Sequence, residues 1–319
     1  MTQPEVYTLG RLIVDLYASE IGVGLDEVGS FRKYLGGSAA NTAIGLARHG
    51  ASVGLISRVG PDDFGVYLRN QLQKERVDTE MVNVDRKFPT GLAFAALFPP
   101  NDSKVLFYRK PCADANLSLG DIRFDKLKNA RMLVVACTAL AVSPGREAAL
   151  AALEANRAAG GINVLDIDFR PIFWADEAEA KLYYRAAIRM SDVVMANEPE
   201  LEFAGGSAHP AEAAANLLDL GVKEVVAKRG SEGCLYFSPS GNLQVPAVPV
   251  DVLNTLGAGD GFGAAYTFGL LQGWDVQRRL EYAAAAGAIV VSRHSCSEAM
   301  PTRKEVEDLL AANVKGASS

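Results

Sequence analysis

The sequence predicts an α/β protein built on a mainly parallel sheet. From Val53 onward, short runs of β-branched residues alternate with amphipathic stretches rich in Ala and Leu, which is the pattern of strands joined by crossover helices. The chain has 319 residues, 49% of them hydrophobic, and is therefore long enough to bury the core that such a fold requires.

The predicted strands and helices follow one another along the chain. Strands of the central sheet are expected at residues 52–59, 131–137, 163–168, 192–197 and 223–228. Helices that connect them are expected at residues 64–75, 145–159, 178–190 and 211–220. After Lys228 the signal changes to two short strands and then to three helices, at residues 234–237, 243–246, 256–271, 275–291 and 302–313.

Two stretches interrupt this alternation, at residues 17–35 and 88–110. In the second stretch, two apolar runs flank the turn-like segment PPNDS. Because a complete βα unit separates the two stretches, they can form a small second layer only by meeting in space. No linker, repeat or low-complexity segment divides the chain, so a single domain over residues 1–319 is expected.

Charge and hydropathy exclude several classes of protein. The net charge is −6 and the basic residues are spread along the chain, which argues against nucleic acid as a partner. The longest apolar stretch near the C-terminus, residues 283–291, is far shorter than the ~20 residues that span a bilayer. The N-terminal segment lacks the apolar core of a signal peptide. We therefore expect a cytoplasmic protein that binds neither membrane nor nucleic acid.

The cysteines and histidines restrict the possible chemistry. Cys112, Cys137, Cys234 and Cys296 are far apart and form no C-x-x-C pair, which favours free thiols in a reducing cytosol. The chain has 3 histidines and none is spaced with a cysteine or another histidine, so a His-rich zinc site is not expected. A catalytic base is therefore expected to be a carboxylate.

The segment DVLNTLGAGDGFGAAYTFGLLQG contains the strongest candidate for chemistry. Its glycine-rich turn, Gly257-Ala258-Gly259, leads directly into a helix, where free N–H groups and the positive helix end favour an anion. The adjacent Asp260 could accept a proton from an attacking hydroxyl, as a carboxylate base does in phosphoryl transfer. The alternative is structural, because Asp is also a preferred N-cap residue in an ordinary tight turn.

Two other phosphate-binding motifs were weighed for this segment. Residues 259–264 fit G-x-G-x-x-A imperfectly, but a dinucleotide fingerprint opens a βαβ unit and here one helix follows another. A nicotinamide-dependent oxidoreductase is accordingly disfavoured. The chain has no Gly-Lys dipeptide, which excludes a Walker A loop.

A second candidate cluster lies near the N-terminus, in LGGSAAN. Gly36 and Gly37 precede the predicted helix 39–49, and Asn41 offers both a donor and an acceptor to a polyhydroxylated ligand. A capped helix start is the structural alternative. Asp15 is placed at the end of the first predicted strand, where ligand sites of α/β sheets form, although a turn residue fits there equally.

The two clusters, in this order, resemble the two signatures of the ribokinase-like (PfkB) carbohydrate kinases. GGSAANTAIGLARHGASVGLISRVGPDDFG is similar to the first signature and NTLGAGDGFGAAYTFGLL to the second. Asn197-Glu-Pro-Glu200 matches the N-x-x-E element of that family, and KRGSEG at residues 228–233 stands where the family has a glycine turn against the nucleotide. The resemblance runs through essentially the whole chain.

This resemblance implies a three-layer α/β/α sandwich in which the two interrupting stretches form a small β lid over the sugar. It implies that Asp260 is the base and that residues 257–259 form the anion hole. ATP and Mg²⁺ are the implied cofactors, and a homo-oligomer is possible. The implied ligands are Asp15, Gly36, Gly37 and Asn41 for the sugar, Asn197, Lys228, Gly230 and Gly233 for the nucleotide, and Glu200 for Mg²⁺ through water. A capped helix start is the alternative for Asn197-Glu-Pro-Glu200.

One position departs from the family pattern. The second signature usually opens with Asp, which in some relatives helps to hold a monovalent cation, but here it opens with Asn254. The resemblance therefore leaves dependence on K⁺ open.

Several segments indicate the substrate class. FYRKPCADANL, TALAVSPGREA, DIDFRPIFWADEAEAKLYY and SRHSCSEAMPT resemble the 5-dehydro-2-deoxygluconokinases of inositol catabolism, and two of them are also similar to 2-keto-3-deoxygluconate kinases. Arg109 and Arg170 could each form a fork onto a substrate carboxylate, with Asp168 as a further substrate-binding residue. The alternatives are an ion pair of Arg170 with Asp166 or Asp168, and a solvated charge at Arg109.

The sequence thus predicts an ATP-dependent kinase that phosphorylates the terminal hydroxyl of a keto-deoxy sugar acid. Neutral sugars such as fructose or ribose rank lower, because they would leave two arginines without an anionic partner. A catalytically silent sugar-acid sensor is the alternative outside the enzymes.

Overall fold

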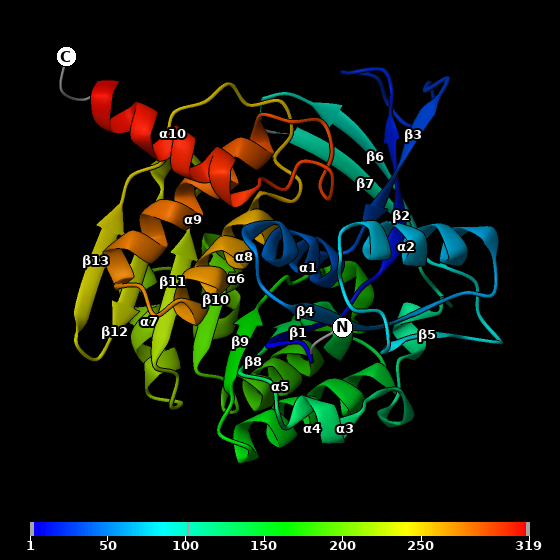
Figure 1. The fold of residues 1–319 in the computed structure, drawn as a ribbon, viewed down its shortest axis with the longest axis horizontal. Helices are drawn as coiled ribbons and strands as arrows, with labels where there is room; N and C mark the ends of the chain where they lie inside the picture. The colour runs from blue at the N-terminus through cyan, green and yellow to red at the C-terminus, as the bar shows by residue number, and fades with distance from the viewer. Residues whose placement is uncertain (1–2, 101, 317–319) are drawn as a thin grey trace.

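Two β-sheets organise the protein in the computed structural model, which describes residues 3–100 and 102–316. The larger sheet has nine strands in the order β13-β12-β11-β10-β9-β8-β1-β4-β5, and the smaller has four in the order β3-β2-β6-β7. Helices cover both faces of the larger sheet, and the smaller sheet stands at one end of it (Figure 1). The α/β/α sandwich predicted from the sequence is confirmed.

The larger sheet is parallel except at one edge. Strands from β5 to β11 along the sheet run parallel, and β12 and β13 complete the edge as an antiparallel hairpin. Both faces are covered, which explains the nearly continuous apolar runs of its central strands. The strands are β1 (Val6–Leu9), β4 (Val53–Val59), β5 (Val82–Val84), β8 (Met132–Ala136), β9 (Ile162–Asp166), β10 (Val193–Asn197), β11 (Glu224–Lys228), β12 (Cys234–Ser238) and β13 (Gly241–Val245).

Two hydrophobic cores lie on opposite faces of this sheet. Helices α1 (Ser38–His49), α2 (Asp63–Lys74), α8 (Ala258–Leu271), α9 (Val276–Val291) and α10 (Arg303–Gly316) contribute to one core. The other core involves α3 (Phe124–Leu127), α4 (Gly145–Ala158), α5 (Glu177–Ile188), α6 (Glu198–Gly205) and α7 (Pro210–Leu218). Short 3-10 helices are η1 (Asp114–Asn116), η2 (Leu119–Asp121), η3 (Cys137–Leu140), η4 (Pro171–Phe173) and η5 (Gly230–Glu232).

The predicted elements agree closely with the observed ones. The five central strands expected from the sequence correspond to β4 and β8–β11, with ends displaced by one or two residues. The helices expected between the strands and at the end of the chain correspond to α2, α4, α5, α7, α8, α9 and α10. These elements have strong apolar periodicity and covered faces, which makes them readable from one sequence.

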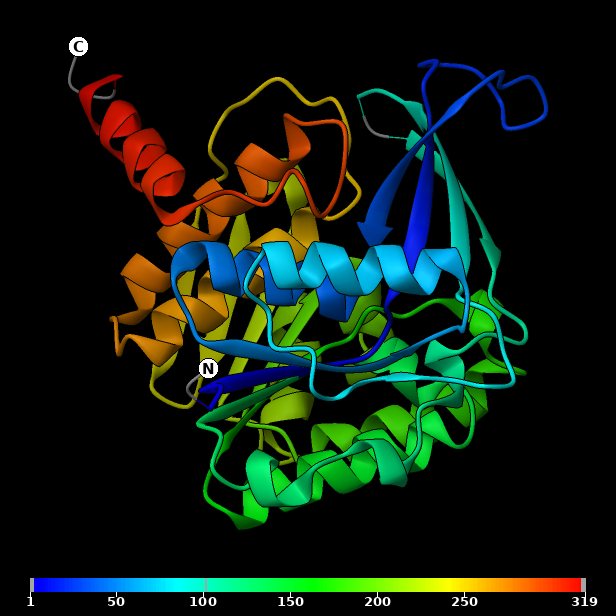
Figure 2. The ribbon, with the colours of Figure 1, turned by 45° about the vertical axis from the view of Figure 1, so that its right-hand side comes forward.

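The smaller sheet takes three of its strands from the two stretches that break the alternation, but its first strand begins before residue 17. It contains β2 (Ile13–Ala18), β3 (Phe31–Gly36), β6 (Leu92–Phe98) and β7 (Asp102–Tyr108), and Figure 2 shows it projecting beside α1 and α2. β2 pairs antiparallel with β3 and parallel with β6, while β6 and β7 form a hairpin. We refer to these four strands as the small sheet.

The small sheet corrects the placement of Asp15. The first strand of the larger sheet, β1, ends at Leu9, whereas Asp15 lies in the middle of β2, opposite Tyr34 and Ala93. The sequence predicts that Asp15 ends the first strand of the central sheet. Asp15 belongs instead to the small sheet, because the chain leaves the larger sheet at Gly10, whose φ is 150°.

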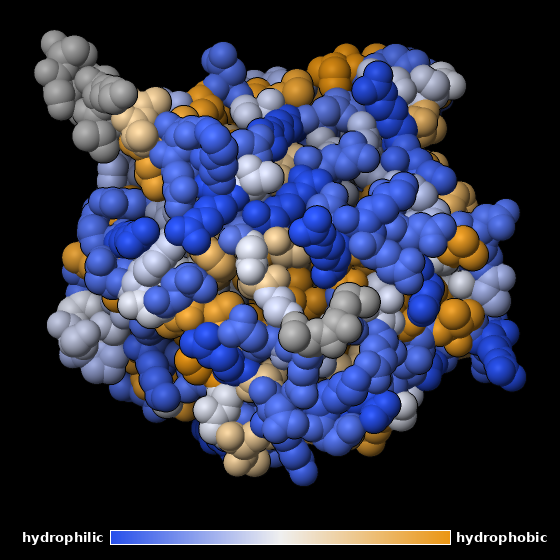
Figure 3. Space-filling model, viewed as in Figure 1, coloured by the Kyte–Doolittle hydropathy of each residue, from blue (hydrophilic) through white to orange (hydrophobic). Residues whose placement is uncertain are grey.

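Among the described residues, no helix is both long enough and apolar enough to cross a bilayer. On the face shown in Figure 3, hydrophilic residues predominate and apolar residues are scattered among them. All four cysteines are free, as predicted, and all four are buried.

Candidate active site

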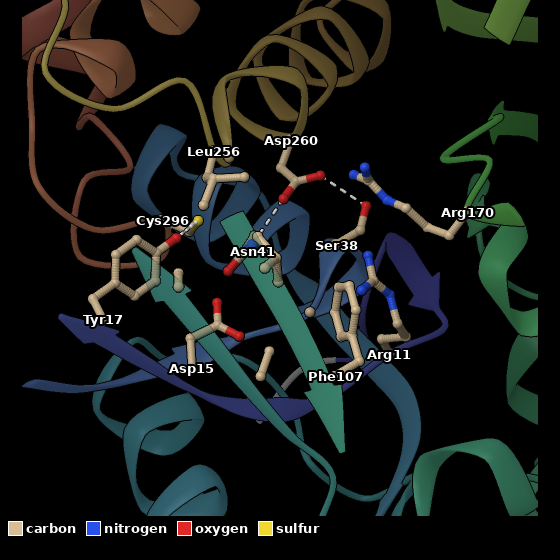
Figure 4. Close-up of a pocket in the computed structure, with 15 residues that line it drawn as sticks. Arg11, Asp15, Tyr17, Ser38, Asn41, Phe107, Arg170, Leu256, Asp260 and Cys296 are labelled. Atoms are coloured by element: carbon tan, nitrogen blue, oxygen red, sulfur yellow. Dashed lines mark hydrogen bonds between the residues drawn. The ribbon is translucent and has the colours of Figure 1, made fainter. Parts of the chain in front are cut away.

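A cavity lies where the small sheet meets the starts of α1 and α8 (Figure 4). Its wall combines β2, β6 and β7 of the small sheet with the connection between β1 and β2 and with the two glycine-rich segments. The lining residues include Arg11, Asp15, Tyr17, Gly37, Ser38, Asn41, Phe107, Arg170, Leu256, Gly257, Asp260 and Cys296. The two clusters singled out in the sequence therefore meet in one site, although more than 200 residues separate Asn41 from Asp260.

The turn before α8 has a conformation that requires glycine. Gly257 is the N-cap of the helix and has a φ of 84°, in the left-handed region. A Cβ at this position would lie 2.9 Å from both Cβ and Sγ of Cys296. The close approach and the positive φ together bring the amino-terminal end of α8, with its partial positive charge, to the cavity wall.

Asp260 is not the N-cap residue of α8. It is the third residue of the helix, and its carboxylate accepts hydrogen bonds from Ser38 Oγ at 2.7 Å and from Asn41 Nδ2 at 2.8 Å. The structural alternative weighed for Asp260 is therefore wrong. Burial and the nearby Asp168 raise the pKa of Asp260 to about 6, so the carboxylate is ionised at neutral pH yet remains basic enough to take a proton.

The first glycine-rich segment brings α1 against this carboxylate. Gly37 has a φ of 101°, and a Cβ there would lie 2.4 Å from the carbonyl oxygen of Arg11. A Cβ at Gly36 would lie 2.1 Å from the carboxyl carbon of Asp15. Both glycines therefore serve close packing around the cavity, and Gly37 lines it directly.

Two predicted sugar ligands face the cavity with groups free to bind. Asn41 uses its amide nitrogen on Asp260, while its buried Oδ1 has no hydrogen-bond partner among the described residues. Asp15 points into the same cavity from β2 (Figure 4). Burial raises the pKa of Asp15 to about 7, against the opposing effect of Arg11. Asn41 and Asp15 thus offer acceptors to a ligand rich in hydroxyl groups.

The arginines are arranged differently from the prediction. Arg109 is 6% exposed, its guanidinium forms an ion pair with Asp114 at 2.7 Å, and it does not line the cavity. It is therefore not a solvated charge, and its expected contact with a substrate carboxylate stays a prediction. The sequence could not distinguish these cases, because the partner Asp114 reaches Arg109 only through the local fold.

Asp168 also differs from its predicted role, since it contacts arginines instead of lining the cavity. Its carboxylate binds Arg11 Nη2 at 2.7 Å and Arg170 Nε at 3.0 Å. Burial opposes ionisation, but Arg11 and Arg170 hold the pKa of Asp168 below its usual value. Arg170 thus forms the ion pair with Asp168 that was the structural alternative to substrate binding. Its side chain is nevertheless 46% exposed and lines the cavity.

A second charged group lies beside the turn, on the side assigned to the nucleotide. Lys228 Nζ forms an ion pair with Asp166 at 3.0 Å, and a Cβ on Gly259 would lie 3.2 Å from that ammonium. Asp166 and Glu200 raise the pKa of Lys228 although burial opposes them. A positive charge therefore sits directly beside the amino-terminal end of α8.

Asn197 and Glu200 form a reciprocal capping box at the start of α6. Asn197 Oδ1 accepts the N–H of Glu200 at 2.9 Å, and Glu200 Oε2 accepts the N–H of Asn197 at 2.9 Å. The structural alternative for this motif is thus present. Glu200 is 7% exposed, and burial raises its pKa to about 7. A role with the nucleotide would use the carboxylate oxygen that does not take part in the cap.

The glycine turn after β11 has positive φ angles at both predicted positions. Gly230 has a φ of 55° and Gly233 a φ of 85°. A Cβ at Gly233 would lie 2.0 Å from the carbonyl oxygen of Val245, whereas nothing lies within 4 Å of the corresponding position at Gly230. Gly233 is therefore required by packing, and Gly230 leaves open space at the surface.

Asn254 stabilises the loop before Gly257 through two hydrogen bonds. It is 2% exposed, its Nδ2 donates to the carbonyl oxygen of His294 at 3.0 Å, and its Oδ1 accepts the N–H of Leu256 at 2.9 Å. A neutral amide satisfies both contacts, whereas an Asp could not donate to the carbonyl.

Sequence reasoning missed several residues of the cavity. Arg11 belongs to no motif of the sequence, and Ser38 belongs only to the glycine-rich segment LGGSAAN. Tyr17 and Cys296, whose OH and Sγ are 2.7 Å apart, come from opposite ends of the chain. Phe107 lies on β7 and closes one side.

Comparison with known proteins places these features in context. The family model described as pfkB family carbohydrate kinase matches residues 3–303. A 5-dehydro-2-deoxygluconokinase of Geobacillus kaustophilus (strain HTA426) is 37% identical over 317 residues, which cover 98% of this chain and 95% of the relative. The structure of a candidate ribokinase II from E. coli with ATP and Mg²⁺ superposes with a TM-score of 0.91 at 30% identity, covering 97% of this chain and 99% of that chain. A double mutant of Vibrio cholerae O395 fructokinase, bound to fructose, ADP and potassium ion, gives 0.87 at 26% identity, covering 97% and 100%.

Proposed function

Because the chain belongs to the pfkB family of carbohydrate kinases, we propose that it transfers the γ-phosphoryl group of ATP to the terminal hydroxyl of 5-dehydro-2-deoxy-D-gluconate. The product is the 6-phosphate, formed in the cytoplasm during myo-inositol catabolism. The observation that carries the chemistry is Asp260, a carboxylate with a raised pKa held at the cavity wall beside an exposed helix end.

Asp260 is the proposed general base. Ser38 and Asn41 each donate a hydrogen bond to one of its two oxygens, which orients the carboxylate and favours its ionised form. The hydroxyl of the sugar would lose its proton to Asp260 as it attacks phosphorus. A base with a pKa near 6 is suited to this step, because it is free of its proton at neutral pH and still attracts one.

The amino-terminal end of α8 is the proposed anion hole. The N–H groups of residues 257–260 would face the charge that develops on the transferred group, and Lys228 adds a positive charge beside Gly259. Such fixed donors act at low energetic cost, because they are already oriented before the reaction begins. Positioning and electrostatic stabilisation are the main contributions expected in phosphoryl transfer.

The nucleotide and Mg²⁺ are expected on the side of Lys228 and the turn at residues 230–233. No group of three or more His, Cys, Asp or Glu side chains in residues 3–100 and 102–316 is arranged to hold a metal ion. This fits Mg²⁺ that arrives with ATP, since Mg²⁺ keeps several waters and binds protein through one or two carboxylates. Glu200 is the proposed carboxylate, through water. Bound Mg²⁺ would neutralise charge on the phosphates.

The choice of a sugar acid rests on the relatives and on the charge of the cavity. Arg11 and Arg170 both line it and share a single carboxylate partner, Asp168. A neutral sugar such as fructose or ribose would leave this positive charge without a partner. 2-Keto-3-deoxygluconate, which also carries a carboxylate, is the second candidate substrate.

Replacing Asp260 with Asn tests the proposed chemistry. We expect kcat to fall by about 10²–10⁴-fold, the typical contribution of a general base, while the affinity for ATP is retained. ADP release should be measured with 5-dehydro-2-deoxygluconate, 2-keto-3-deoxygluconate, fructose and ribose side by side. Asp219→Asn, an exposed position at the end of α7, is the matched control.

Three results would contradict the proposal in different ways. Near-normal turnover of Asp260→Asn would show that Asp260 is not the general base. A preference of the wild-type enzyme for fructose or ribose would show that the substrate is not a sugar acid. Binding of the sugar acid without any ADP release would instead identify a catalytically silent sensor.

A further inference from the structure

We infer that Arg11 recognises the carboxylate of the substrate and that Asp168 positions Arg11 for this contact. The inference rests on the proposed function and adds a residue that determines specificity. It also replaces Arg109 in this role, because Arg11 lines the cavity and Arg109 does not.

Arg11 is held so that one nitrogen remains available. It lies in the connection between β1 and β2, where the chain passes from the larger sheet to the small sheet. Its Nη2 donates to Asp168 at 2.7 Å and its Nε donates to Thr138 Oγ1 at 3.1 Å. Among the described residues, Nη1 has no acceptor, and Figure 4 shows the guanidinium directed into the cavity.

Two arginines lie at this end of the cavity, where Asp260 interacts electrostatically with Arg170 and Asp15 with Arg11. Two guanidinium groups, Arg11 and Arg170, share the single carboxylate of Asp168. Arg170 uses Nε for that contact, and its two terminal nitrogens have no partner among the described residues. An anionic group between the two arginines would meet donors from both sides, which is the arrangement that suits a carboxylate.

The backbone at Asp168 supports a positioning role. Asp168 has a φ of 32°, an unusual value for a residue other than glycine, at a site where burial is nearly complete. A conformation of this kind persists only where the surroundings enforce it. Here the strained backbone allows the Asp168 carboxylate to contact both arginines. We therefore infer that this conformation serves to position Arg11 and Arg170.

The surroundings strengthen an interaction with Arg11. Its guanidinium carbon lies 5.7 Å from the centre of the Phe107 ring and 6.0 Å from that of Phe173, and Arg11 is 6% exposed. Charges that are shielded from water interact more strongly than charges at the surface. Arg11 is thus a buried cation that faces a cavity, which distinguishes it from the surface arginines of the chain.

An anion at Arg11 could come from the sugar acid or from the γ-phosphate of ATP. Phe107 and Asp15, which line the cavity with Arg11, belong to the small sheet. Lys228, by contrast, already supplies a cation beside the phosphate-binding turn. These positions favour the sugar acid as the partner of Arg11.

Kinetics of enzyme variants with an acidic substrate and its neutral amide test this assignment. The variants are Arg11→Gln, Arg11→Lys and Asp168→Asn, and the substrates are 5-dehydro-2-deoxygluconate and its neutral amide. For the wild type we expect kcat/KM to be about 10–100-fold higher for the acid than for the amide, as for a charge-assisted hydrogen bond. Arg11→Gln should lose this discrimination while KM for ATP is unchanged.

The other variants separate recognition from folding. Arg11→Lys retains the positive charge without the forked guanidinium, so it should recover part of the preference for the acid over the amide. In Asp168→Asn this preference should be weaker than in the wild type and stronger than in Arg11→Gln. Arg157→Gln, at an exposed position on α4, is the matched control. Thermal unfolding of each variant with saturating ATP checks that the fold is intact.

The possible failures are distinguishable. Equal loss of activity toward acid and amide in Arg11→Gln would indicate a structural role, and a rise in KM for ATP would assign Arg11 to the γ-phosphate. Either result overturns the inference and leaves the proposed function in place. A wild-type enzyme that uses neither acid nor amide would overturn both.

Discussion

At the scale of single residues, two carboxyl groups in the cavity have raised pKa values. Asp260 and Asp15 come from α8 and β2, and burial raises the pKa of each. They differ in their contacts, because Ser38 and Asn41 donate hydrogen bonds to Asp260. The pH dependence of kcat is expected to follow Asp260, the proposed base, whereas both carboxyl groups contribute to the pH dependence of stability.

The pH profile of kcat should reveal Asp260. Turnover requires the ionised carboxylate, so kcat should fall about tenfold per pH unit as the pH decreases below about 6. Ser38→Ala removes a hydrogen bond that favours ionisation, and the midpoint should therefore move to higher pH. The measurement is steady-state turnover with saturating substrates from pH 5 to pH 9. A midpoint that stays in place in Ser38→Ala would contradict the assignment to Asp260.

Asp15 should affect stability with the opposite pH dependence from most carboxylates. Its pKa is about 7 when folded and about 3.9 when unfolded, so the folded state binds the proton more tightly. The associated stability is present at low pH and is lost as the pH rises toward 7. Asp15→Asn removes this loss.

We therefore expect Asp15→Asn to be more stable than the wild type at pH 8, by at least about 1 kcal/mol. At pH 5 the difference should be much smaller. Urea unfolding at the two pH values measures both. Equal effects of the substitution at pH 5 and pH 8 would show that the carboxyl does not titrate as inferred.

At the scale of elements, the start of α8 is the feature on which the site depends. Gly257 combines a positive φ with close contact to Cys296, while Gly273, just beyond the same helix, has a φ of 69° and open space around it. The two positions share the backbone requirement and differ in steric contact. They therefore form a natural pair for substitution.

Gly257→Ala should disrupt the turn and the site together. An added Cβ would meet Cys296 at 2.9 Å, and the left-handed conformation disfavours alanine by about 1–2 kcal/mol. We expect a loss of kcat by at least about tenfold. Gly273→Ala should show only the loss of stability, with normal turnover. Similar activities for the two variants would mean that the geometry of the turn is not critical.

At the scale of the whole molecule, the cavity lies where the two sheets meet. Its wall includes strands of the small sheet and the starts of helices that pack on the larger sheet, so a ligand there contacts both. Ligand that binds only the folded state stabilises it by an amount set by concentration and affinity. Unfolding temperature is therefore a readout of binding that does not require turnover.

We expect the sugar acid, at about 100 times its dissociation constant, to stabilise the fold by about 2.7 kcal/mol, which is an increase of several degrees in Tm. Asp260→Asn should retain most of this shift, because the base is needed for turnover more than for binding. Differential scanning calorimetry with and without the sugar acid provides the measurement. No shift in either protein would exclude the sugar acid as a ligand.

The sequence by itself determined the α/β architecture, the central strands and the residues of both glycine-rich segments. Apolar periodicity, glycines and a helix start are local properties, so one chain suffices to read them. The tertiary structure decided which groups meet. It placed Asp15 on the small sheet, paired Arg109 with Asp114, and turned Asp168 toward two arginines. Ion pairs depend on side chains that come together only after folding, and for this reason Arg11 could be assigned to the cavity only from the folded protein.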